Sequence, residues 1–88
     1  MKLLGKFMVR QVMDNTVAIP VSSTAIKFSG MILLNEVSLV IWKCLEKGTE
    51  LRCIVSALTD AFEVSPEEAE ADTLEFLEKL RKMQLLEE

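Results

Sequence analysis

Two hydrophobic patterns divide this sequence into an N-terminal part and a longer C-terminal part. Over residues 7–12 and again over residues 16–21, β-branched and aromatic residues alternate with more polar ones. A period of two is typical of β-strands. Asp14 and Asn15 lie between the two segments and favour a turn, so the segments are predicted to form a hairpin. Pro20 has no backbone N–H to donate, and strand pairing is expected to stop or bulge there.

A third strand is predicted over residues 27–34, after a polar loop over residues 22–26. Gly30 interrupts the middle of this strand, and apolar residues lie on both of its faces. A strand that is apolar on both faces should be covered on both faces. In a three-stranded meander it is an edge strand, so its outer backbone groups stay free to pair with an added strand.

Apolar residues recur at spacings of three and four in the C-terminal part, which predicts three helices. Asn35 is a good N-cap for the first helix, and Gly48 is expected to end it. Thr49 is expected to cap the second helix. Ser65, with proline next and Glu68 three residues on, predicts a capping box at the start of the third. The order of three strands and three helices predicts a single α+β domain over residues 1–88, resembling a winged helix-turn-helix with a three-stranded antiparallel sheet.

Composition excludes several classes of function. The 88 residues are half apolar and carry a net charge of −4, without a single histidine. Histidine is the commonest general base and the commonest metal ligand, so its absence argues against both kinds of site. The serines therefore have no histidine partner, and the three glycines form no phosphate-binding loop. We expect no catalytic residue, no metal site and no cofactor, and therefore a small binding module and not an enzyme.

The charge is divided unevenly along the chain. Residues 1–47 have a net charge of +3, whereas residues 48–88 have a net charge of −7. From Asp60 to Glu78 there are eight acidic residues and no basic residue. Either these acids form a solvated helix face, or they attract a basic partner. The second helix would contact DNA in a winged helix, but Arg52 is its only base, which argues against binding of nucleic acid.

The cysteines and the first residues indicate the cellular compartment. Cys44 lies within the apolar stripe of the first helix and is interpreted as a small buried hydrophobe, whereas Cys53 lies off the stripe of the second. Nothing in the sequence aligns the two, although a disulfide between them stays open. No signal peptide follows Met1, and no apolar run approaches the ~20 residues of a membrane span. We therefore expect a cytoplasmic protein that does not enter a membrane.

Two of the predicted surfaces together suggest a peptide site. At about 100° per residue, Leu74 and Leu85 fall outside the main apolar stripe of the third helix, so Leu74, Leu77 and Arg81 form a shoulder beside its core face. A strand edge next to such a shoulder is a groove for an extended peptide. The alternatives are that Leu74 is simply exposed or belongs to a dimer contact, so the chain is expected to be a monomer or a homodimer.

A set of short segments also follows the order and spacing of a known family. The most specific is Gly-Met-x-x-Leu-Asn-Glu at residues 30–36, before an apolar helix that contains Ile41 and Trp42. The other segments lie at residues 7–10, 17–21 and 68–72, the last followed by Phe76, Leu77 and Leu80. Taken together, over about residues 5–86, they resemble the PqqD-like family, whose members are also called RiPP recognition elements.

The resemblance implies a winged helix-turn-helix-like domain that is not an enzyme. It implies a peptide chaperone that binds the leader of a ribosomally made precursor and presents it to a modifying enzyme, often a radical SAM enzyme. The leader is expected to add as a strand beside the third predicted strand and to pack against the third helix, where Asp72 matches the family's usual aspartate. The expected peptide-binding residues are Lys27, Phe28, Ser29, Gly30, Met31, Ile32, Leu33, Leu74, Leu77 and Arg81.

Two alternatives stay open at this point. Founding members of the family serve synthesis of pyrroloquinoline quinone, but many relatives serve other peptide products, and nothing in this sequence singles out the quinone pathway. The runner-up function is a small winged-helix module for regulation or DNA binding.

Overall fold

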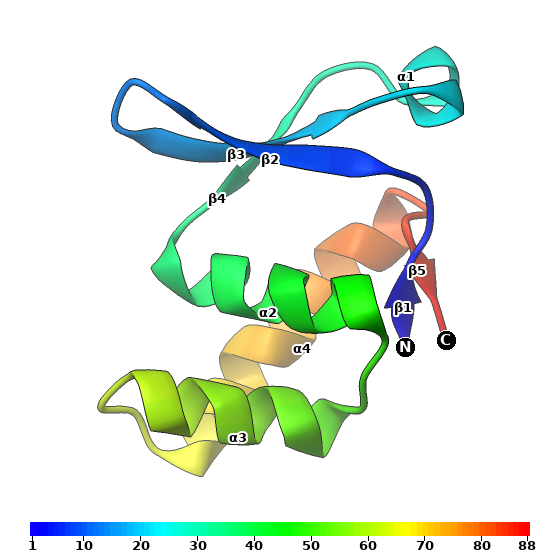
Figure 1. Cartoon of the computed structure of the whole chain (residues 1–88). Helices are drawn as coiled ribbons and strands as arrows, with labels where there is room; N and C mark the ends of the chain where they lie inside the picture. Colours follow the sequence, from blue (N-terminus) through cyan, green and yellow to red (C-terminus); the bar gives the residue numbers. More distant parts are fainter.

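The computed structural model describes all 88 residues, and in it a three-stranded sheet lies over the three longer helices (Figure 1). The elements in chain order are β1 (Lys2–Leu3), β2 (Phe7–Val12), β3 (Asn15–Pro20), α1 (Ser23–Lys27), β4 (Ile32–Leu34), α2 (Glu36–Lys47), α3 (Leu51–Ala61), α4 (Pro66–Lys82) and β5 (Leu86–Glu87). The main sheet is antiparallel in the order β2-β3-β4. The predicted α+β architecture is confirmed.

The predicted hairpin of β2 and β3 forms, but its two turn residues are Met13 and Asp14, and Asn15, expected in the turn, begins β3. Val12 is paired with Asn15 beside the turn, and Phe7 is paired with Pro20, where β3 ends as expected. Met13 has a φ of 58°, a positive value at the first of the two turn residues, as in a type II′ turn. Glycine normally occupies that position, so Met13 adopts a strained backbone conformation.

The third strand is shorter than predicted, and a helix replaces the polar loop before it. A strand was expected over residues 27–34, but β4 contains only three residues, and α1 precedes it. The hydroxyl of the buried Thr24 accepts a hydrogen bond from the Lys6 N–H at 2.7 Å, and the Thr24 carbonyl accepts one from the Phe28 N–H at 2.9 Å. Gly30 has a φ of 101°, a left-handed conformation outside any strand. The prediction failed because contacts of Thr24 with distant and local backbone decide this segment.

The core lies between the inner face of the sheet and the helices. Trp42 of α2 is fully buried, and the ring of Phe7 from β2 meets it edge-on at a centroid distance of 5.2 Å. Ile32 and Leu34 of β4 are buried in the same core. Because alternate residues of a strand point to opposite faces, the side chain of Leu33 between them points outward.

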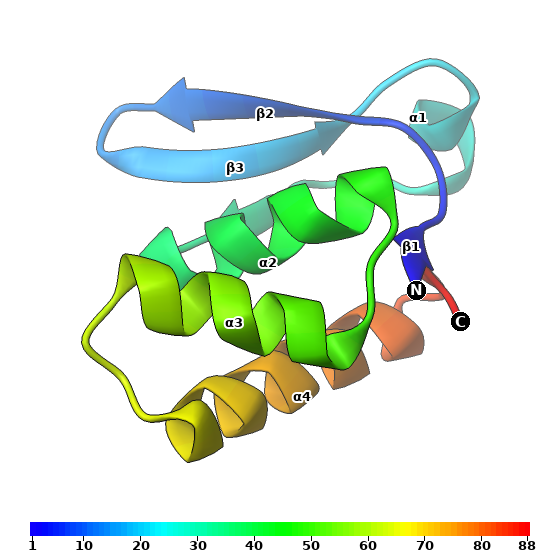
Figure 2. The same ribbon diagram turned by 60° about the horizontal axis from the view of Figure 1, so that its bottom comes forward.

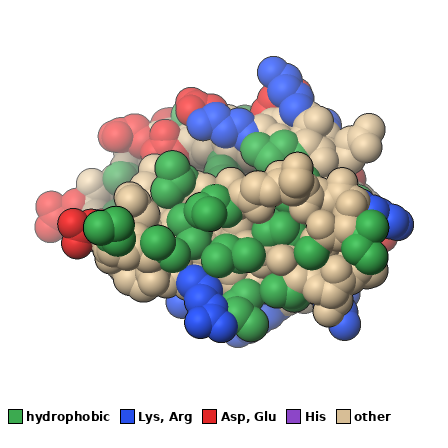
Figure 3. All heavy atoms as spheres, turned by 90° about the horizontal axis from the view of Figure 1, so that it is seen from above, with side chains coloured by type: hydrophobic (Ala, Val, Ile, Leu, Met, Phe, Trp, Pro, Cys, Tyr) green, Lys and Arg blue, Asp and Glu red, His purple; other side chains and the backbone are tan.

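The outer face of the sheet is uncovered, contrary to the expectation that the third strand is covered on both faces. Leu33 is 66% exposed and Met31 is 57% exposed. Figure 3 looks onto this side of the molecule and shows hydrophobic side chains gathered on it. Helices α2, α3 and α4 lie beneath the opposite face, so only one face of β4 is buried (Figure 1).

A second, two-stranded sheet joins the ends of the chain and was not predicted. Lys2 of β1 is paired with Glu87 of β5, and the Leu4 N–H donates to the Leu85 carbonyl at 2.8 Å. Both chain ends therefore lie side by side, close to the C-terminal end of α4 (Figure 2). Strands of two residues are too short to leave a pattern in the sequence.

The starts of α2 and α4 are where the sequence predicts them. The side chains of Asn35 and Ser65 each accept a hydrogen bond from the backbone N–H three residues on, at 2.8 and 3.1 Å. The reciprocal bond that completes a capping box forms at Asn35 but not at Ser65, where it was expected. Thr49 does not cap α3, whose N-cap is Glu50. The Thr49 hydroxyl donates to the Glu50 carbonyl at 3.4 Å, and the Thr49 backbone N–H donates to the Met1 carbonyl at 2.8 Å.

Candidate functional site

A groove runs between β4 and α4. It consists of three adjoining hollows, and we call the whole feature the β4–α4 groove. The central hollow has a volume of about 360 Å³. It shares Phe28 and Met83 with a hollow of about 360 Å³ beside α1, and it shares Phe76 and Lys79 with a hollow of about 190 Å³ beside α2. The lining residues of the central hollow are Phe28, Met31, Ile32, Leu33, Asn35, Ser38, Phe76, Lys79 and Met83.

The first wall is the open edge of β4, whose backbone has free hydrogen-bonding groups. In β3 and β4, Ala18 lies opposite Ile32 and Val17 lies opposite Leu33. A two-residue turn closes on a hydrogen-bonded pair, and bonded and non-bonded pairs alternate along an antiparallel ladder. Val12 and Asn15 beside the turn form a hydrogen-bonded pair, so the alternation makes Arg10 and Val17 a bonded pair as well. The backbone groups of Ala18 then point away from β2 and bond to Ile32 of β4. The N–H and C=O of Leu33 therefore point away from β3, toward the open edge.

The second wall is one line of α4, formed by Phe76, Lys79 and Met83. These residues lie three and four apart, so they share a face of the helix. Phe76 is half-buried, Met83 is 40% exposed and Lys79 is exposed. An apolar surface with one cation near its middle thus faces the open strand edge.

The structure places the predicted helix residues outside this wall. Leu77 is only 2% exposed and belongs to the core, and Leu74 is 49% exposed but does not line the groove. Arg81 donates hydrogen bonds to Glu88 and to Glu78, and these bonds raise the pKa of the Arg81 guanidinium. The helix wall of the groove is therefore the line of Phe76, Lys79 and Met83, and not the predicted shoulder. Leu85, which was also expected outside the apolar stripe, is buried.

The sequence carried a signal for the residues of α4 that line the groove, but the signal was not sufficient to identify them. At spacings of three and four, Phe76 and Met83 continue the apolar stripe of the third predicted helix. In the structure Phe76 packs against the core, whereas Met83 is 40% exposed. Helical periodicity identifies the apolar stripe of α4, but it does not show which side of that stripe faces the sheet. That side depends on the rotation of α4 about its own axis, which packing decides.

The predicted strand residues lie at the groove with two exceptions. Phe28, Met31, Ile32 and Leu33 line its central hollow, and Lys27 lines the hollow beside α1. Ser29 and Gly30 are exposed in the connection from α1 to β4, and neither lines a hollow. Ile32 contributes a buried side chain that points toward the core, so an added strand would meet mainly the backbone and outward side chains of its neighbours.

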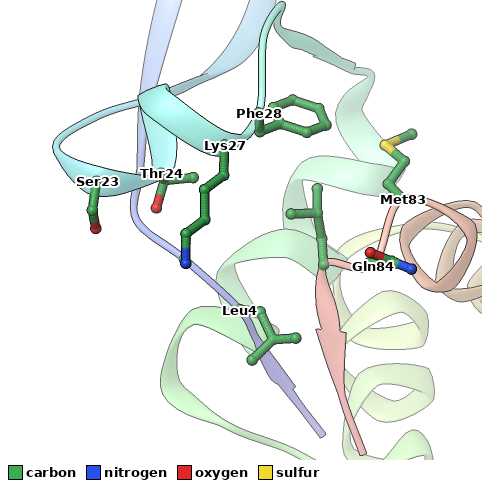
Figure 4. A pocket seen from close by; sticks show the side chains of 9 residues that line it. Leu4, Ser23, Thr24, Lys27, Phe28, Met83 and Gln84 are labelled. Carbon is green, nitrogen blue, oxygen red and sulfur yellow. The ribbon is translucent and has the colours of Figure 1, made fainter.

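The end of the groove beside α1 carries one charged group. Figure 4 shows Lys27 extending from α1 across this hollow, with Leu4 beyond its ammonium group and with Met83 and Gln84 on the far wall. The remaining lining residues are uncharged. This end is therefore positive.

The end of the groove beside α2 has the opposite sign. Asp72 and Glu75 of α4 line it together with Lys79, whose Nζ lies 3.9 Å from a carboxylate oxygen of Glu75. The ion pair offsets one acid, and Asp72 gives this end its net negative charge. The two ends of the groove thus differ in sign.

The two cysteines, the acidic side chains and the helices bear on three other kinds of function. The thiols of Cys44 and Cys53 are free. Burial is the main cause that raises the pKa of the Cys44 thiol, and the nearby Cys53 thiol is a smaller cause. A raised pKa makes a cysteine a poorer nucleophile at neutral pH. No group of three or more acidic or cysteine side chains is arranged to hold a metal ion. None of the helices combines the length and the apolar character that crossing a membrane requires.

Helix α3 does not offer the surface that DNA recognition needs. Arg52 is its only base, and an Arg52 nitrogen lies 3.5 Å from a carboxylate oxygen of Glu50 in an exposed ion pair. A recognition helix normally presents several cationic or amide side chains to the major groove.

Two comparisons with known proteins each found a match. The model of the family described as coenzyme PQQ synthesis protein D (PqqD) matches residues 13–86. A similar solved structure is that of TbiB1 in complex with the TbiA(beta) leader peptide, with a TM-score of 0.73 and 26% sequence identity. The alignment covers 99% of this chain and 95% of that one. No curated protein matches the chain.

Proposed function

We propose that the β4–α4 groove of this chain, which belongs to the PqqD family, binds the leader of a ribosomally made precursor peptide. The observation that carries the proposal is the open edge of β4, which faces an apolar line of α4 across the groove. The similar TbiB1 structure holds a leader peptide, which supports a peptide ligand for this chain as well.

The leader is proposed to add as a fourth strand of the main sheet. The outward N–H and C=O of Leu33 would pair with its backbone, and this pairing is independent of sequence. Because side chains of a strand alternate, every second side chain of the leader would point toward Phe76 and Met83. Backbone pairing would thus supply affinity, and the apolar hollow would supply specificity.

No covalent chemistry is assigned to this chain in the proposal. Its role is to hold the leader in an extended form and to present the precursor to a separate modifying enzyme, which we propose to be a radical SAM enzyme or another peptide-modifying enzyme. The composition without histidine and the raised thiol pKa of Cys44 are consistent with a binding role.

Titration calorimetry with the leader of the precursor encoded beside the gene tests the proposal. Met83→Ala and Leu74→Ala form a matched pair, since both residues are apolar, lie on or just after α4 and are similarly exposed, but only Met83 lines the groove. We expect Met83→Ala to weaken binding severalfold and Leu74→Ala to leave Kd unchanged. Equal effects would contradict this site, and no binding to a folded chain would contradict the function for that precursor. Light scattering on the same samples would reveal a homodimer that occupies the β4 edge.

A further inference from the structure

We infer that the β4–α4 groove selects peptides by the order of their charges, an inference that rests on the proposed function. The preferred ligand is an extended segment with an acidic side chain at the α1 end, an apolar middle and a basic side chain at the α2 end. The inference starts from the charged residues that line the groove, which are Lys27, Asp72, Glu75 and Lys79.

The positions of these charges fix the polarity of the groove. Lys27 lies alone at the α1 end. At the other end, Asp72 and Glu75 outnumber Lys79, which is already paired with Glu75. An acidic ligand group is therefore attracted to the Lys27 end and repelled from the Asp72 end, and a basic group experiences the reverse.

The length of α4 along the groove sets the spacing of the ligand charges. Asp72 and Met83 are 11 positions apart, which at a rise of about 1.5 Å per residue is about 16 Å. Met83 shares its hollow with Lys27, so this length approximates the distance between the two charged ends. An extended peptide advances about 3.3 Å per residue, so its acid and base should lie about five residues apart. Flexible side chains on both partners widen this spacing to about four to six residues.

The apolar part of the groove lies between the charged ends. Phe28, Met31 and Phe76 line the central hollow, where Lys79 is the one charged residue and is paired with Glu75. The charged groups at the ends are exposed. Exposed ion pairs each change affinity by only about twofold to fivefold. The end charges therefore discriminate between peptides and fix their direction, while apolar contacts and backbone pairing supply most of the affinity.

Selection from a displayed library of random 12-residue peptides tests the charge order, whatever the sequence of the natural ligand. We expect peptides that bind the groove to carry an acid and a base four to six residues apart. A synthetic consensus peptide and a version with its acid and base exchanged would then be compared by fluorescence anisotropy. The exchanged peptide should bind at least about fivefold more weakly at low salt, and the difference should shrink in 0.5 M salt because screening acts on exposed charges.

Variants of the chain identify the group that selects the acid. Lys27→Glu should weaken binding of the consensus peptide by about twofold to tenfold, and replacing the peptide's acid by lysine should restore it. Lys43→Glu is the matched control, because Lys43 is exposed on α2, lines no part of the groove and gives the same change in net charge.

Two outcomes separate this inference from the function on which it rests. If peptides bind in a manner that Met83→Ala weakens, but Lys27→Glu and Lys43→Glu have equal effects, the charge order is overturned and the peptide-binding function stands. If the library yields no peptide that depends on Met83, the proposed function is overturned together with the charge order.

Discussion

Replacing Leu33 by proline tests strand addition directly. Proline removes one backbone N–H, and the register predicts that this N–H points to the open edge and not to β3. Losing a hydrogen bond with the leader costs about 0.5–1.5 kcal/mol, and leaving the leader carbonyl unpaired in the interface costs about 1–3 kcal/mol more. The total of about 1.5–4.5 kcal/mol corresponds to a rise in Kd of about tenfold to two-thousandfold.

The same substitution should hardly change the stability of the chain. Leu33 is largely exposed, so its side chain contributes little to the core. Proline is tolerated on an edge strand when the N–H that it removes faces outward, and we expect the free energy of unfolding to fall by about 1 kcal/mol or less. Leu33→Ala is the control, since it shortens the same side chain but keeps the N–H.

Calorimetry with the leader and urea unfolding of both variants give the required measurements. A Kd for Leu33→Pro equal to that of Leu33→Ala would refute strand addition at β4. A loss of stability above about 3 kcal/mol would show that the Leu33 N–H is bonded within the sheet, and this would refute the register argument itself.

Three further predictions concern stability. Gly5→Ala should lower the free energy of unfolding by about 2 kcal/mol or more, because Gly5 has a φ of 88° and a Cβ there would lie 2.8 Å from the Thr24 Oγ1. Gly30 has a φ of 101° but no atom within 4 Å of its Cβ position, so Gly30→Ala should lower the free energy of unfolding less in urea titrations. Equal losses of stability would argue against the contact with Thr24. Met13→Gly should stabilise the chain by about 0.5–1 kcal/mol, because glycine relieves the positive φ of this exposed turn residue, and a lower melting temperature would contradict the turn assignment. Burial raises the pKa of the Cys44 thiol, so the unfolded chain loses this proton first, and stability should fall as the pH rises above about 8.5. Urea unfolding from pH 7.5 to 10 under reducing conditions would measure how the free energy of unfolding falls with pH. Cys44→Ala should make this fall smaller. If the variant leaves the fall unchanged, another group causes it.

Local features of the sequence determined much of the fold. The alternation over residues 7–12, the turn and Pro20 were enough for the hairpin and its end, because strand period and turn chemistry act between near neighbours. Asn35 and Ser65 located the starts of α2 and α4 for the same reason, since a capping side chain bonds only two or three residues away. The open edge of the third strand was also predicted, from the order of the strands in a meander.

Tertiary structure decided the features that depend on distant partners. The helix α1 exists where a loop was expected because the Thr24 hydroxyl is bonded to Lys6, 18 residues earlier. The sheet of β1 and β5 joins residues from the two ends of the chain, which no local pattern records.

The groove itself shows this division most clearly. The sequence determined that an open strand edge and an amphipathic helix α4 would form its two walls. It did not determine that Phe76 and Met83, and not Leu74 and Arg81, would face the strand. Helical periodicity fixes the relative angles of side chains about one axis, but the rotation of that axis against the sheet results from all the contacts that bury the apolar stripe at once.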